Sequence, residues 1–109
     1  MESWDLRTLE IEPHHPRILH SSLGEARSIA IRLPAGEALG DHQVHEYAHL
    51  IVISGDVQVR HGDEETQAST GFMAIFDPGE RHAVRALTDT RLLLILAPWP
   101  GDGHPGARF

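Results

Sequence analysis

Short runs of alternating apolar and polar residues, separated by turn residues, make up most of the chain. In residues 28–33, Ile29, Ile31 and Leu33 fall on one side, a period of two that is typical of a strand with one covered face. Similar strand-like runs occupy residues 49–53, 57–60, 72–76, 82–86 and 91–96. Turns rich in Gly, Pro and Asp separate them, and no segment carries a capped stripe with the helical period. The pattern predicts an all-β sandwich or barrel.

The composition narrows the class of protein. With 109 residues, the chain is long enough for one hydrophobic core, and we expect a single domain over residues 1–109. Its core should span residues 28–97, with a loosely structured N-terminal segment and a loosely structured tail at residues 98–109. The net charge of −7 argues against nucleic-acid binding, and the absence of cysteine excludes disulfides and thiolate nucleophiles. The chain shows neither a membrane span nor a signal peptide, so we expect a cytoplasmic protein without membrane contact.

Histidine is the unusual component, with nine copies, and it is the side chain most ready to bind a metal or move a proton near neutral pH. Five of the nine lie beside Pro or Gly turns, and we interpret them as solvated: His14, His15, His20, His61 and His104. In the strand predicted at residues 82–86, His82 alternates with Arg81 and Arg85 and shares its side with Val84. Because two arginines mark the solvent face, we expect His82 inside the barrel, where its ring nitrogens need hydrogen bonds or a metal.

Glycines and histidines at fixed spacing carry a resemblance to a known family. They are Gly36, His42, Gly55, Gly71, Gly79 and His82. At these positions the chain resembles the cupin superfamily, whose first motif is Gly, five residues, His, one residue, His, three or four residues, Glu, six residues, Gly. The second motif is Gly, five residues, Pro, one residue, Gly, two residues, His, three residues, Asn. The resemblance implies a small single-domain cupin, a double-stranded β-helix (jelly-roll) barrel of six to eight strands in two antiparallel sheets.

The chain also departs from the family motifs. The second His position holds Val44, the Glu position holds Ala48, and the Pro and Asn positions hold Asp77 and Ala86. Of the family's metal ligands, the resemblance therefore retains His42 and His82. Stable transition-metal sites usually have three or four protein ligands, so the motif is partly degenerate.

Three further candidate ligands follow His42. His45 and His49 are four residues apart, and a one-residue bulge after His42 could turn that pair inward. Regular alternation instead places His49 with Ile51 and Ile53, and it places Glu46 on the face of Val44. The full candidate set for a divalent metal such as Fe, Mn, Ni or Zn is therefore His42, His45, Glu46, His49 and His82.

Two interpretations of the function remain open. The first is a cupin that binds a divalent metal through this histidine cluster and acts on, or senses, a small molecule; whether it is an enzyme is undecided. The alternative is a metal-free binding or regulatory module whose metal site has decayed, as Val44 and Ala48 suggest. With either function we expect a homodimer, because the runs 50–53 and 92–96 are more apolar than one small core needs.

Overall fold

Nine β-strands form the described part of the chain. The structure, a computed structural model, describes residues 1–105 and, for residues 41 and 42, the backbone alone. The strands are β1 (Arg17–Ser21), β2 (Arg27–Leu33), β3 (Ala38–His42), β4 (Tyr47–Ser54), β5 (Asp56–His61), β6 (Glu64–Ser69), β7 (Met73–Phe76), β8 (His82–Ala86) and β9 (Thr90–Ala97). Within residues 1–105 there is no α-helix.

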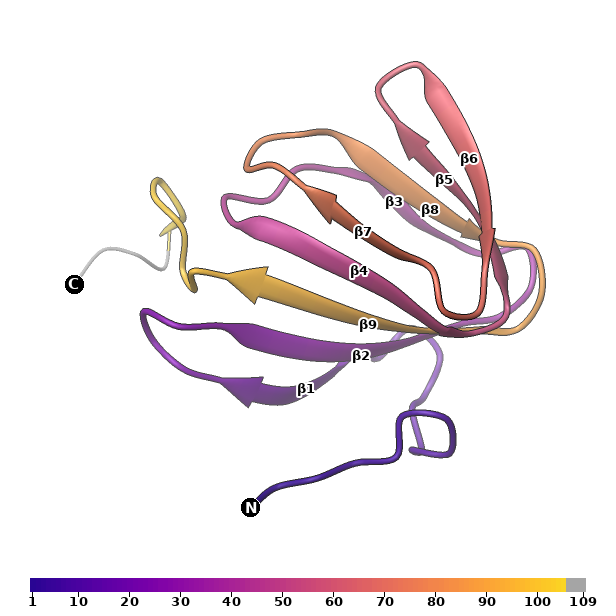
Figure 1. Ribbon diagram of the computed structural model, residues 1–109, viewed down its shortest axis with the longest axis horizontal. Coiled ribbons are helices and arrows are strands. Elements are labelled where there is room, and N and C mark those ends of the chain that lie inside the picture. Colours follow the sequence, from indigo (N-terminus) through magenta and orange to yellow (C-terminus); the bar gives the residue numbers. More distant parts are fainter. Residues whose placement is uncertain (106–109) are drawn as a thin grey trace.

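The strands are arranged in two antiparallel sheets, one of five strands in the order β1-β2-β9-β4-β7 and one of four in the order β3-β8-β5-β6. Figure 1 shows the two layers meeting at one end of the molecule and separating toward the other, where β9 ends and β4 begins. We call this open end, at which Phe76, His82 and Ala97 lie, the mouth. The predicted all-β fold with two antiparallel sheets is confirmed, with nine strands in place of six to eight.

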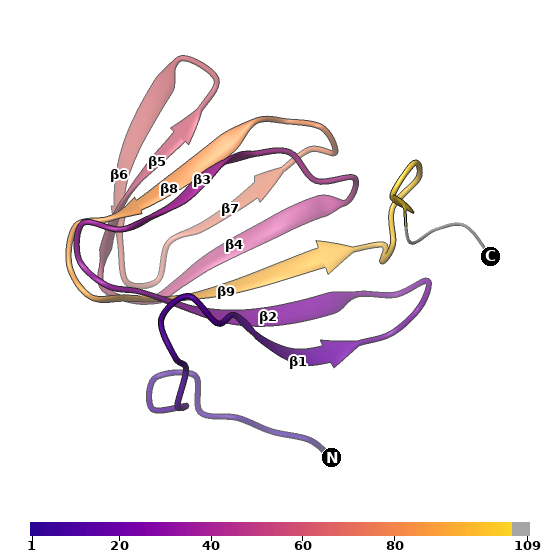
Figure 2. The ribbon, with the colours of Figure 1, turned by 180° about the vertical axis from the view of Figure 1, so that it is seen from behind.

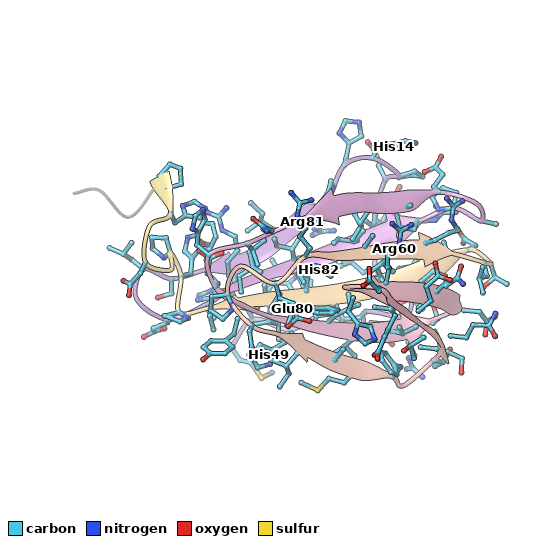
Figure 3. All side chains as sticks on the ribbon, turned by 90° about the horizontal axis from the view of Figure 1, so that it is seen from above. His14, His49, Arg60, Glu80, Arg81 and His82 are labelled. Atoms are coloured by element: carbon cyan, nitrogen blue, oxygen red, sulfur yellow. The ribbon has the colours of Figure 1, made fainter. Side chains whose placement is uncertain are left out.

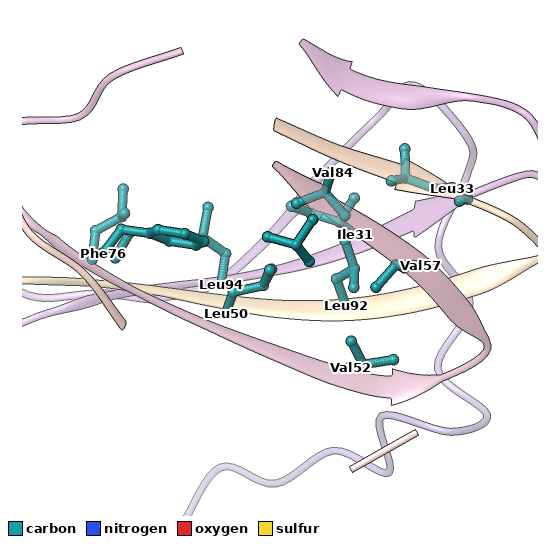
Figure 4. Packing of buried hydrophobic residues seen from close by; sticks show 13 residues of the cluster. Ile31, Leu33, Leu50, Val52, Val57, Phe76, Val84, Leu92 and Leu94 are labelled. Atoms are coloured by element: carbon teal, nitrogen blue, oxygen red, sulfur yellow. The ribbon is translucent and has the colours of Figure 1, made fainter. Parts of the chain in front are cut away.

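The core lies between the sheets and follows the predicted alternation. On β4 the buried residues are Ala48, Leu50 and Val52, and Figure 4 shows how such side chains from both sheets pack together. Burying one Leu or Val side chain contributes about 1.5–3 kcal/mol. The intervening residues of β4 face outward and are only partly buried. This alternation determines which side chains can reach the inside of the barrel.

The end opposite the mouth is closed by the turn between β4 and β5. Gly55 has a φ of 108°, and a Cβ atom there would lie 2.4 Å from Thr90 Oγ1 and 2.7 Å from the Asp89 carbonyl oxygen. The Asp56 carbonyl accepts hydrogen bonds from Thr90 Oγ1 at 3.2 Å and from the Leu87 N–H at 2.8 Å. Only glycine fits this combination of backbone angle and close approach. The glycine that ends the first motif therefore lets the chain cross from one sheet to the other.

Segments outside the strands also pack on the barrel. Near the N-terminus Ile11 is buried, and Arg91 Nη1 donates to the carbonyls of Leu6 and Leu9 on the outside of β9. After β9, Trp99 packs against the core, and its ring lies under the Arg27 guanidinium, whose carbon is 3.9 Å from the ring centroid. Figure 2 shows the N-terminal segment at the end where β2 leads into β3 and the C-terminal loop at the mouth. The two segments thus pack near opposite ends of the barrel.

Candidate functional site

Three histidine positions lie side by side across the four-stranded sheet at the mouth. β8 lies between β3 and β5, and the register pairs His82 with His42 on one side and with His61 on the other. A register shift in β3 produces this alignment, since three residue steps from Leu39 to His42 oppose two steps on β8. The irregularity lies before His42, whereas the bulge considered from the sequence would follow it. The strand pairing thus brings together histidines that are distant in the sequence.

His82 is buried, with 4% of its surface exposed, as the alternation of β8 predicts. Its Nδ1 lies 3.2 Å from the Glu80 carbonyl oxygen, and its ring stacks on Phe76 with centroids 4.1 Å apart and an angle of 7° between planes. A carbonyl can only accept, so Nδ1 donates, which in the neutral ring makes Nε2 the acceptor nitrogen. A hydrogen bond of this kind also orients histidines that bind metals.

His61 is a partly buried strand residue and not the solvated loop residue that the sequence suggests. It is the last residue of β5, its side chain is 33% exposed, and it continues the alternation of the buried Val57 and Val59. Its Nε2 lies 3.3 Å from Thr66 Oγ1, and its Nδ1 lies 3.8 Å from a carboxylate oxygen of Glu64. The ring is therefore turned toward β6 and the β5–β6 turn.

Glu46 is the most deeply buried charged residue of the described part, with 1% exposure. It directly precedes β4 and continues the inward alternation of Ala48 and Leu50. One carboxylate oxygen, Oε2, accepts a hydrogen bond from the Gly101 N–H at 2.7 Å, whereas the buried Oε1 has no hydrogen-bond partner within the described residues. A buried carboxylate oxygen without a partner is costly. Its position therefore marks a place where a cation or donor would be stabilised.

The C-terminal loop holds Glu46 in this position. A Cβ atom on Gly101 would lie 2.1 Å from the His45 carbonyl oxygen, so the loop packs directly on the backbone that leads into β4. The His104 ring lies edge-on to Trp99 at 4.8 Å and to His45 at 5.5 Å between centroids. His45 itself is exposed. The loop therefore covers Glu46, while His45 lies outside it.

His49 lies on the outer face of the five-stranded sheet. It is paired with Ile75 on β7 and Ile95 on β9, and it alternates with the buried Ala48 and Leu50. Figure 3 shows His82 near the middle of the molecule and His49 toward its margin. The structure therefore brings neither His45 nor His49 to the inner face beside His82.

The possible metal ligands at the mouth are few. Among the side chains that the structure describes, no three His, Asp or Glu residues gather around one point, and the His42 side chain lies outside this set. The buried residues there that carry a possible metal-ligand atom are His82, through Nε2, and Glu46, through Oε1, while Val44 and Ala48 provide none. With His42 as the third ligand, the set of two imidazoles and one carboxylate suits a first-row transition metal.

Comparison with known proteins assigns the family. Residues 30–98, more than half of the chain, match the family described as "Cupin domain". The chain therefore belongs to the cupin domain family, and the resemblance seen in the sequence is confirmed. A search of curated proteins found no match.

Solved structures agree with this fold. The protein TT1209 from Thermus thermophilus is 27% identical, with a TM-score of 0.76 over 90% of this chain and 98% of that one. An RmlC-like cupin family protein with a double-stranded β-helix fold from Methanocaldococcus jannaschii is 19% identical, with a TM-score of 0.72 over 84% and 89% of the two chains. The Schizosaccharomyces pombe Cnp3 cupin domain is 12% identical, with a TM-score of 0.76 over 85% and 71%. Within residues 1–105 no helix is long and apolar enough to cross a membrane.

Proposed function

We propose that this cupin domain binds one divalent transition metal at the mouth of the barrel and uses it to bind a small molecule. The ligands are His42, His82 and Glu46. The observation that carries the proposal is the Oε1 atom of Glu46, which is buried and has no hydrogen-bond partner within the described residues.

The surroundings of the two described ligands support this assignment. The Glu80 carbonyl orients the His82 ring with Nε2 as the acceptor, and the stacked Phe76 fixes the plane of the ring. The Gly101 N–H occupies Oε2 of Glu46 and leaves Oε1 as the ligand atom. Hydrogen bonds of this type keep metal ligands in one tautomer and one orientation. When bound, a metal supplies Lewis acidity and open coordination positions for an oxygen-bearing ligand.

Metal content of the purified chain tests the proposal. The wild-type protein, prepared without chelator and titrated with Mn²⁺ or Zn²⁺, is expected to bind one ion per chain. Glu46→Gln keeps an acceptor for the Gly101 N–H but removes the charge, and it should weaken metal binding at least tenfold. His49→Gln, on the outer face, is the matched control and should bind as the wild type does. If Glu46→Gln and His49→Gln bind metal equally, the assignment of Glu46 is wrong.

A second candidate is a metal-free binding module, and a specific observation favours it. Val44 and Ala48 stand where the family motif has two ligands, and Ala48 is completely buried. In that case His82 and Glu46 act as hydrogen-bonding groups for a small polar ligand. Thermal unfolding of the chelator-treated chain against a set of small metabolites separates the two candidates. A melting temperature that rises with a ligand in excess EDTA favours the metal-free module.

We also propose that the chain forms a homodimer through the outer face of β4, β7 and β9. Exposed and half-buried apolar side chains gather there, namely Ile51, Ile53, Met73, Ile75, Leu93 and Ile95. An apolar face of this kind is costly to leave in water, and one patch can meet its own copy in a two-fold dimer. Ile75→Lys should convert a dimer seen by sedimentation velocity into a monomer. A wild-type monomer at micromolar concentration would contradict this proposal.

A further inference from the structure

A cavity of about 530 Å³ lies away from the mouth, at the seam between the two sheets where β2 leads into β3. Its inner wall consists of Ile31 and Leu33 from β2 and Leu39 from β3. The other residues around it are His14, Pro16, Arg32, Glu37 and Ala38. None of the proposed metal ligands lines this cavity, and its residues Glu37, Ala38 and Leu39 fall at the unspecified positions between Gly36 and His42 of the first motif. It has the size of a small-molecule pocket.

Hydrogen bonds make the β3 side of the cavity rigid. The connection between β2 and β3 is tied to β8 in both directions, since the Gly36 N–H donates to the Ala86 carbonyl and the Ala86 N–H donates to the Glu37 carbonyl, each at 2.8 Å. Arg85 Nη1 adds a bond to the Gly36 carbonyl at 3.3 Å. On the other side, β2 pairs with β9 along its whole length. The cavity is therefore already formed without a ligand.

The N-terminal segment supplies the third side. Figure 2 shows it running past the end where β2 leads into β3, and the buried Ile11 anchors it. His14 has a φ of 67°, a left-handed conformation that costs energy for any residue with a side chain. Its Nε2 lies 3.2 Å from Glu37 Oε1, so the strained residue bridges the segment to the β2–β3 connection. This bridge lies on the rim of the cavity.

The rim carries charged groups, but each of them has a partner. Arg32 Nε lies 3.4 Å from Asp89 Oδ1, and Glu37 is paired with His14. An ionic ligand would have to displace one of these pairs, whereas an uncharged ligand can leave both in place. The inner wall is apolar throughout. Rim and wall together favour an uncharged ligand with a large apolar part.

We propose that this cavity is a second binding site, for an uncharged and mainly apolar small molecule such as an aromatic compound with a hydroxyl or carbonyl group. Its apolar part packs between Leu33 and Leu39, and its polar group lies at the rim beside His14. Transfer of apolar surface from water supplies the binding free energy. The site is independent of the metal proposed at the mouth.

Fluorescence titration with N-phenyl-1-naphthylamine, an uncharged aromatic fluorophore, tests the site on the full chain. We expect saturable binding of one fluorophore per chain. Leu39→Trp fills the cavity from its wall and should weaken binding at least tenfold. Leu87→Trp is the control, because Leu87 is exposed and lines a different pocket together with residues such as Asp56 and Ala68. This variant should change the affinity for the fluorophore less than twofold. Equal affinity in both variants would overturn the proposal.

Methyl NMR of the wild-type chain provides a test that needs no variant. The fluorophore should shift the methyl signals of Ile31, Leu33 and Leu39 in the presence and in the absence of metal. Shifts confined to Met73 and Ile75 on the outer face, or no saturable binding at all, would refute the second site. Because the test involves no mouth residue, its failure is distinguishable from a failure of the proposed metal site.

Discussion

The two ends of this barrel differ in how they are built. At the mouth, a C-terminal loop rests on the buried carboxylate of Glu46, and a row of histidine positions crosses three strands. At the other end, the backbone turn around Gly55 closes the fold, and the nearby cavity has an apolar inner wall. At the mouth the buried Oε1 of Glu46 has no hydrogen-bond partner within residues 1–105, whereas the turn at Gly55 is held by hydrogen bonds such as that from Thr90 Oγ1 to the Asp56 carbonyl.

This difference separates the turn that stabilises the fold from the end that holds the proposed metal site. An unpartnered carboxylate oxygen lowers stability, so a fold that keeps one at the mouth is expected to use it for binding. The turn at Gly55, with its close contacts and hydrogen bonds, is expected to set the stability of the whole domain. Substitutions at the two ends should therefore differ in how much they lower the free energy of unfolding and in how much of the domain they affect.

The largest effect is expected for Gly55→Ala. The new Cβ would collide with Thr90 Oγ1 and with the Asp89 backbone, and the positive φ disfavours any side chain. We expect a loss of about 4 kcal/mol in the free energy of unfolding, measured by urea denaturation. Gly40→Ala is the control, because a Cβ there meets no atom within 4 Å, and it should cost less than about 1 kcal/mol. If both variants lose the same free energy of unfolding, the turn at Gly55 does not have the stabilising role proposed for it.

A smaller and more local effect is expected for Gly101→Ala. Its Cβ would overlap the His45 carbonyl, so the loop must leave the barrel and the Glu46–Gly101 hydrogen bond is lost. We expect a loss of about 2 kcal/mol. Hydrogen exchange should rise in the loop and at the start of β4 while the turn at Gly55 stays protected. Faster exchange spread evenly over both ends would show that the loop is not a separate unit.

The smallest effect is expected for Arg27→Met. It keeps most of the apolar stem of Arg27 but removes the cation above the Trp99 ring, a contact worth about 0.5–1 kcal/mol. Arg60→Met is the matched control. Arg60 is exposed and forms a loose ion pair with Glu65, with 3.9 Å between its Nε and Glu65 Oε1. A surface ion pair of this kind contributes little to the free energy of unfolding. Urea denaturation should rank Arg27→Met below Arg60→Met in stability, and the reverse order would argue against Trp99 as an anchor of the loop.

The strands that the sequence pattern predicts are those with a buried face, while β1, β3 and β6 were missed. Each of these three is an edge strand. β6 is mostly polar, and β3 carries Gly40 and Asp41, which are rare in strands. Edge strands pack against fewer neighbours, so they need no regular apolar alternation. Their position in the fold is set by hydrogen-bonded pairing with neighbouring strands, which the pattern of apolar and polar residues does not reveal.

The candidate site was only partly predictable for a similar reason. The alternation of β8 predicted that His82 points inward, because Val84 and the two flanking arginines mark the faces. The sequence places Glu46 on the face of Val44, but its anchor, Gly101, is 55 residues away in a tail without strand pattern. The neighbours of His61 are turn residues, and its alignment with His82 depends on the register of β5 with β8. Long-range pairing, rather than local pattern, assembles the mouth.

The central claim is that Glu46 and His82 hold a metal at the mouth together with His42. Anomalous diffraction from crystals of the full chain grown with Zn²⁺ locates the ion directly. We predict one strong peak within about 2.0–2.2 Å of His82 Nε2 and of Glu46 Oε1, the usual zinc–ligand distances. A peak elsewhere, for example at the exposed His14 or His20, or an empty mouth with the Glu46 carboxylate unchanged, would contradict the account.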